Sequence, residues 1–242
     1  MSKQLWRRKF AVMATAVATA ILSNASTAEA TTVLYVPQDD RPVSLAYTVA
    51  TAQEAGYTVL TPPQYYISGR NFQGNAEAMW RWVDENVNKA DVLVLSTDSL
   101  IYGGLVDSRK HNLDLHTLEY RVRHIEDLHK KYPNVPIYAF GTVMRSPRAS
   151  GGGVEPAYYD QYGPTIFRIA ALQDKLDSGS LTQEETQKLM SLQASVPVEY
   201  LQDWFDRRQK NMKINKELID ETRSGVFDYF ALGHDDTSQL SQ

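Results

Sequence analysis

The sequence predicts an α/β protein with a mainly parallel β-sheet, Rossmann-like or part of a barrel, and with a helical insertion or appendage. Between residues 31 and 145, short apolar runs alternate with amphipathic stretches of helical length, which is the pattern of βαβ units. Acidic and arginine-bearing clusters directly follow four of the apolar runs. A chain of 242 residues with 43% hydrophobic positions suits one globular domain.

The core elements follow one another in a regular order. We expect strands at 33–36, 57–60, 91–96 and 136–143, and helices at 43–55, 74–87 and 113–132. Gly56 is placed to end the first helix, and Pro133 and Pro136 flank the turn after the third. Such connections imply right-handed crossovers within a parallel sheet.

The segment 146–223 is predicted to be a long loop followed by a helical insertion. Its first part is rich in glycine and tyrosine, and forms either an ordinary surface connection or a cover over the strand ends. Residues 164–223 are expected to be helical, with Thr182 and Glu185 forming a capping box.

The segment 224–242 should hold one more core strand, at 226–232, and a polar loop. Because a loop such as 235–239 normally introduces another helix, we expect this chain to be the amino-terminal portion of a longer protein.

Residues 1–30 have the pattern of a signal peptide. Basic residues precede an apolar stretch from Phe10 to Leu22, and Ala28-Glu29-Ala30 supplies small residues for cleavage. The stretch is shorter than the about 20 residues of a membrane-spanning helix, which favours cleavage over a retained anchor and predicts no stable membrane insertion afterwards. Arg7-Arg8 also permits a twin-arginine signal. We expect a periplasmic or secreted protein that begins at Thr31.

The expected mature chain is acidic and has no cysteine. The leader carries four basic and one acidic side chain, so its loss changes the formal charge from −4 to −7. That charge disfavours binding to the phosphate backbone of a nucleic acid. The lack of cysteine excludes disulfides, thiolate nucleophiles and cysteine-ligated zinc. We expect no cofactor.

The four polar clusters should converge, since ligand sites of open parallel sheets lie outside the carboxyl ends of the strands. The first cluster, Asp39-Asp40-Arg41-Pro42, has three interpretations. Asp40 caps the next helix while Arg41 pairs with a carboxylate and Pro42 enters the first turn. Alternatively, one aspartate faces the site while the other holds the loop, or both supply oxygen ligands to a metal.

The second cluster is a predicted loop, 96–109, that contains Asp98, Tyr102, Asp107 and Arg109. Its pair Gly103-Gly104 permits a close approach of a ligand. The glycine spacing does not match a phosphate-binding loop, so a neutral polar ligand such as a sugar is easier to accommodate.

The last two clusters follow the strands at 136–143 and 226–232. Arg145 and Arg148 can orient a substrate acid, hold a site aspartate ionised, or brace the loops through salt bridges. His234-Asp235-Asp236 permits a metal or acid/base role without a diagnostic ligand spacing, and Asp236 can equally cap a helix.

Several ordered blocks of the chain resemble one known family. The blocks are Tyr35-Val36-Pro37-Gln38-Asp39-Asp40-Arg41-Pro42, Ser96-Thr97-Asp98-Ser99-Leu100-Ile101-Tyr102-Gly103-Gly104-Leu105, Met144-Arg145 and Asp235-Asp236-Thr237-Ser238-Gln239. They are similar to those of an uncharacterised exported bacterial family, domain of unknown function 4127 (DUF4127). The chain departs from the family pattern at Gln38, where an apolar residue is expected, and at Ser44, where asparagine is expected. The resemblance implies an exported α/β protein and names no reaction.

The leading functional hypothesis is a carbohydrate-active enzyme, a glycoside hydrolase with paired carboxylates. Asp40 and Asp98 are the predicted pair, with Asp235 and Asp236 beside them and a tyrosine-rich loop to stack on sugars. The other candidate substrate-binding residues are Asp39, Arg41, Tyr102, Asp107, Arg109, Arg145 and Arg148. The predicted partner is a small-molecule or glycan substrate. Alternatives are a metal-dependent hydrolase using Asp39, Asp40, Asp235 and His234, and a sugar-binding module without turnover.

Overall fold

The computed structural model describes residues 30–149 and 152–235. Every helix and strand in it belongs to the unit that runs from Thr31 to Gln242. The predicted signal peptide lies outside the described residues except for Ala30, and Asp236 lies outside them too. In the described part of the chain, no helix is long and apolar enough to cross a bilayer.

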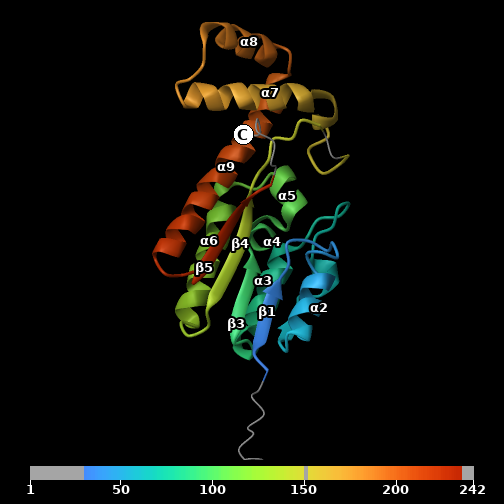
Figure 1. Cartoon of the computed structure of the whole chain (residues 1–242), viewed down its shortest axis with the longest axis vertical. Coiled ribbons are helices and arrows are strands. Elements are labelled where there is room, and N and C mark those ends of the chain that lie inside the picture. Colours follow the sequence, from blue (N-terminus) through green and yellow to red (C-terminus); the bar gives the residue numbers. More distant parts are fainter. Residues whose placement is uncertain (1–29, 150–151, 236–242) are drawn as a thin grey trace, which may run out of the picture. The chain divides into compact units, whose positions relative to one another are not determined.

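The centre of the fold is one parallel five-stranded sheet (Figure 1). Its strands are β1 (Thr32–Val36), β2 (Thr58–Leu60), β3 (Val92–Ser96), β4 (Ile137–Val143) and β5 (Tyr229–His234). The order across the sheet is β2-β1-β3-β4-β5, which leaves the sheet open and confirms the predicted α/β class. The connection after β1 leads to β2 on one side, whereas the connection after β3 leads to β4 on the other, so the topological switch point lies between β1 and β3.

The helices largely follow the sequence prediction. They are α2 (Ala46–Glu54), α3 (Ala76–Asn86), α4 (Thr97–Tyr102), α5 (Leu105–Lys110), α6 (Leu115–Lys131), α7 (Tyr159–Asp177), α8 (Gln183–Ala194) and α9 (Val198–Arg223), with 3-10 turns at Gln64–Tyr66 and Val87–Lys89. The expectation of a loop at 96–109 was wrong, because α4 and α5 occupy it. The Ser96 side chain accepts a hydrogen bond from the amide of Ser99 at the start of α4, and Gly103, with φ +110°, ends that helix.

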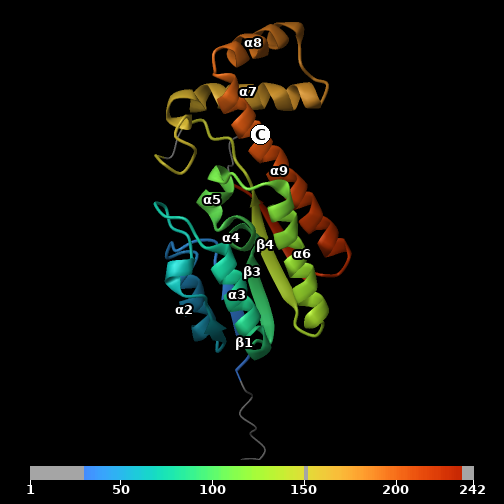
Figure 2. The ribbon, with the colours of Figure 1, turned by 180° about the vertical axis from the view of Figure 1, so that it is seen from behind.

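The main core lies on one face of the sheet. Alternate side chains of β1, β3 and β4 stand in register there: Leu34 beside Leu93, and Leu93 beside Ile137. Apolar residues of α3, α6 and α9 cover them, and Figure 2 shows α3 and α6 in front of the sheet. A parallel sheet is commonly covered on both faces. On the opposite face, however, the paired Tyr138 and Tyr229 are 44% and 60% exposed.

A second, smaller core joins α7, α8 and α9. Trp204 and Tyr159 are fully buried in it, and their rings pack with centroids 4.4 Å apart. The predicted capping box at the start of α8 is confirmed, because Glu185 N–H donates to the Thr182 hydroxyl and Thr182 N–H donates to the Glu185 carboxylate. Since Met144 also belongs to this core, α7 to α9 adjoin the end of β4.

Candidate active site

Asp98 occupies the centre of the carboxyl edge, next to the switch point. It lies in the first turn of α4, directly after β3, and is 2% exposed. One carboxylate oxygen, Oδ2, accepts hydrogen bonds from Gln38 Nε2 at 2.7 Å and from Thr142 Oγ1 at 3.0 Å. Gln38 follows β1 and Thr142 lies on β4, so side chains from both neighbours of β3 meet at this carboxyl group.

Burial makes Asp98 a weaker acid than an ordinary aspartate. Removal from water raises its pKa to about 6, although the hydrogen bonds from Gln38 and Thr142 oppose that shift and the charge of Asp235 adds to it. Asp235 follows β5 and Asp98 follows β3, so the charges at the ends of these two strands are close enough to interact. A carboxyl group with such a pKa is largely protonated below about pH 6 and can donate its proton there, whereas an ordinary aspartate is already ionised.

Asp39 and Asp40 lie in different surroundings, and the part of the sequence interpretation in which one aspartate holds the loop describes Asp39. Asp39 is buried and holds the loop, since Arg41 Nε donates to it at 2.8 Å and the Arg41 backbone N–H at 3.2 Å. Asp40 is half-buried, and its backbone N–H donates to the carbonyl of Ser68. The expectation that Asp40 caps the next helix was wrong. The helix α2 begins only at Ala46, because residues 41–45 first form turns, and its first turn has no side-chain cap.

Four charged side chains form a connected series of ion pairs beside the site, in the order Asp235, Arg109, Glu155 and Arg145. Arg109 donates to Asp235 at 2.6 Å and lies 3.6 Å from Glu155, and Arg145 Nη2 donates to Glu155 at 2.5 Å. The side chain of Glu155 is completely buried and that of Arg109 is 5% exposed. The sequence interpretation of Arg145 as a loop-bracing ion pair therefore describes the structure. Glu155 was not predicted, because it lies in a loop without periodicity.

Three predicted substrate-binding residues have structural partners. Tyr102 is buried in the main core, where its ring stacks on His111 at a centroid distance of 5.0 Å. Asp107 is buried and accepts a hydrogen bond from Gly74 N–H at 3.0 Å. The Arg148 guanidinium lies 5.6 Å from the centre of the Phe167 ring. None of these contacts reaches Asp98.

The pair Gly103-Gly104 serves close packing within the protein. A Cβ on Gly104 would lie 1.8 Å from the hydroxyl oxygen of Ser68, and one on Gly74 would lie 2.0 Å from the carbonyl oxygen of Gly103. The loop between β2 and α3 therefore packs directly against the α4–α5 turn.

The tyrosines of the predicted loop pack against other side chains of the protein. Tyr159 is buried, Tyr158 stacks on Tyr200 and donates to Asp203, and Tyr162 packs near Tyr200 as well. Phe72, in the loop between β2 and α3, is an exposed aromatic side chain, with 52% exposure. A Cβ on Gly69 would lie within 3 Å of both the Phe72 ring and an Asp40 oxygen, so this ring lies close to Asp40.

Phe72 also lines a polar cleft between the β2–α3 loop and α5. The cleft has a volume of about 270 Å³, and Arg70, Gln73, Asp107 and Lys110 lie in its wall. In the ranges 30–149 and 152–235, no group of three or more His, Asp or Glu side chains could hold a metal ion.

One family model matches residues 33–242, and its description is "Protein of unknown function (DUF4127)". No curated protein and no solved structure matches the chain. The match includes Gln38, Asp98, Thr142, Glu155 and Asp235.

Proposed function

Since the chain belongs to the DUF4127 family, whose description names no reaction, we propose from the chemistry of Asp98 that this member is an exported glycoside hydrolase. The observation that carries the proposal is a buried carboxyl group with a pKa of about 6 at the switch point of a parallel sheet. A glycosidic oxygen is a poor leaving group until it is protonated, and the acid that protonates it needs a raised pKa.

Asp98 acts as the general acid in this proposal. Gln38 and Thr142 are both half-buried and donate to Asp98 Oδ2, so the proposal requires one of these side chains to move before a glycosidic oxygen can approach that atom. Asp40 is the second carboxylate, acting as nucleophile or as base towards water. A separation of about 5 Å between the two carboxyl groups in the substrate complex would give retention, and about 6.5–9.5 Å inversion.

The surroundings of Asp40 favour a sugar substrate. The exposed Phe72 ring offers an apolar face close to this carboxylate, and the cleft that it lines is rich in hydrogen-bonding side chains. Sugar rings combine apolar faces with hydroxyl edges, so this combination suits them. Export is proposed from the leader pattern of residues 1–30.

Hydrolysis should depend on Asp98 and on the leaving group. With glycans and alkyl glycosides, we expect Asp98→Asn to lower kcat by about 10²–10⁴-fold, the usual contribution of a general acid. With dinitrophenyl glycosides the loss should be much smaller, because that leaving group departs without protonation. The wild-type rate should fall as the pH rises through about 6, where Asp98 loses its proton. Release of reducing ends and of dinitrophenol measures both.

Asp91→Asn is the matched control, because Asp91 precedes β3 at the opposite end and accepts from Thr32 N–H. It should leave the rates unchanged. Glycan binding without bond cleavage would instead identify a sugar-binding module. Full activity of Asp98→Asn on alkyl glycosides would remove Asp98 from the reaction.

A further inference from the structure

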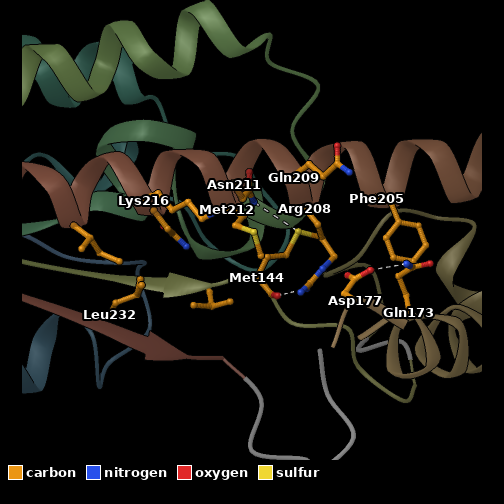
Figure 3. Close-up of a pocket in the computed structure, with 13 residues that line it drawn as sticks. Met144, Gln173, Asp177, Phe205, Arg208, Gln209, Asn211, Met212, Lys216 and Leu232 are labelled. Atoms are coloured by element: carbon orange, nitrogen blue, oxygen red, sulfur yellow. Dashed lines mark hydrogen bonds between the residues drawn. The ribbon is translucent and has the colours of Figure 1, made fainter. Parts of the chain in front are cut away.

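A second cavity lies away from Asp98, between α9, α7 and the ends of β4 and β5 (Figure 3). Its volume is about 610 Å³, within the range of about 300–1,000 Å³ typical of small-molecule sites. Met144 closes the inner wall and Leu232 contributes from β5, while Phe205 and Met212 come from α9. Met144 is 3% exposed and Met212 is 55% exposed, so the cavity runs from a buried floor to an open rim.

Arg208 lies in the wall of the cavity, and its guanidinium group has more N–H donors than it uses within the protein. The Arg208 guanidinium donates to the backbone carbonyl of Met144, which is an uncharged acceptor, and Figure 3 shows it within the cavity lining. In the described chain, the buried side-chain polar atoms without a partner belong to Ser68, Tyr102 and His129. The other Arg208 N–H groups form no hydrogen bond within the described residues and are not among these enclosed atoms, so they can donate to solvent or to a molecule in the cavity that Arg208 lines.

The balance of charge around the cavity favours an anion. Lys216 also lines the wall, and it is in none of the ion pairs between residues of the described ranges. The acid in the lining is Asp177, and its Oδ1 accepts a hydrogen bond from Gln173 Nε2 at 2.8 Å. The lining itself therefore holds two cations and one carboxylate, which already has a hydrogen-bond donor, while the charge of Asp174 outside the lining also acts on Arg208.

We propose that this cavity binds an amphipathic carboxylate, with its head group on Arg208 and its aliphatic chain along Met144, Met212 and Leu232. A guanidinium group matches a carboxylate with two parallel hydrogen bonds. The polarisable methionine side chains adapt to a flexible chain. The site is separate from the reaction proposed at Asp98, so either proposal can fail without the other.

Titration calorimetry with octanoate and decanoate tests this site. Decanoate should bind saturably, and up to about 15-fold more tightly than octanoate, because each buried methylene contributes up to about fourfold. Arg208→Gln and Met212→Asp should each weaken decanoate binding at least about tenfold, through loss of the cation and through charge repulsion respectively. Decanol and decyltrimethylammonium, which have the same chain without the carboxylate, should bind more weakly.

Met190→Asp provides the matched control, since Met190 lies on α8 outside the cavity lining and is 65% exposed. It should bind decanoate as the wild type does. Circular dichroism and thermal unfolding establish that each variant folds, and Met212→Asp keeps the test decisive if Arg208→Gln does not. The proposal is overturned if decanoate fails to saturate the wild type, if decanol or the ammonium binds equally well, or if Met212→Asp binds like Met190→Asp.

Discussion

Replacement of Asp98 by asparagine should make the folded protein more stable at pH 7, by up to about 3 kcal/mol. Burial raises the pKa of Asp98 from 3.8 to about 6, and each pKa unit corresponds to about 1.36 kcal/mol. At neutral pH the wild type must keep an ionised carboxylate in a position with 2% exposure. Asparagine has nearly the same shape and no charge, so it escapes this cost while its oxygen can still accept from Gln38 and Thr142.

The upward direction of the Asp98 pKa shift determines how this stability difference depends on pH. Because the folded-state pKa is raised, the favourable contribution of Asp98 is complete below about pH 4 and is lost as the pH rises to about 6. The stability advantage of the asparagine variant should therefore be near zero at pH 4 and constant above about pH 7. Urea unfolding of both proteins between pH 4 and 8 measures it. Asp91→Asn should lack this advantage, and an asparagine variant at Asp98 that is less stable at pH 7 would contradict the account.

The second large effect is expected at Glu155. Its side chain is completely buried between Arg109 and Arg145, so Glu155→Ala leaves two guanidinium groups without their shared carboxylate. Removal of one partner from a buried ion pair costs about 3–5 kcal/mol, much of it for the uncompensated charge that remains. Urea unfolding at pH 7 should show a loss of this size.

An exposed ion pair serves as the control that distinguishes the effect of burial from the effect of losing a charge. Asp220 pairs with Arg223 at 2.6 Å, but the two side chains are 66% and 75% exposed. Asp220→Ala should change stability by less than about 1 kcal/mol, since exposed ion pairs contribute little. Equal losses in both alanine variants would mean that burial does not decide the importance of Glu155. A double-mutant cycle of Glu155→Ala with Arg145→Ala would then measure the interaction free energy between these two side chains.

The regular part of the fold could be predicted from the sequence because its periodicity is strong. The strand at 91–96 contains an unbroken apolar run from Val92 to Leu95, and the helix at 113–132 repeats its apolar residues at helical spacing. The helices α4 and α5 escaped prediction for a physical reason. Each has six residues, and α4 is buried all round, so neither shows an amphipathic pattern.

The site was predictable in position more than in detail. Topology alone brings Asp98 and Asp235 to one edge of the sheet, because parallel strands end together. The partners of each group depend on loop geometry that no periodicity encodes, as with Glu155 beside Arg109. Gln38 shows the same limit: it stood out as a departure from the family pattern, but its bond to Asp98 became visible only in the structure.

Titration of the Asp98 carboxyl carbon by ¹³C NMR tests the central claim most directly. The resonance, assigned by its absence from the Asp98→Asn spectrum, should shift with a midpoint near pH 6. A midpoint near 4, the value of an ordinary aspartate, would mean that Asp98 is ionised throughout the neutral range and cannot act as the proton donor.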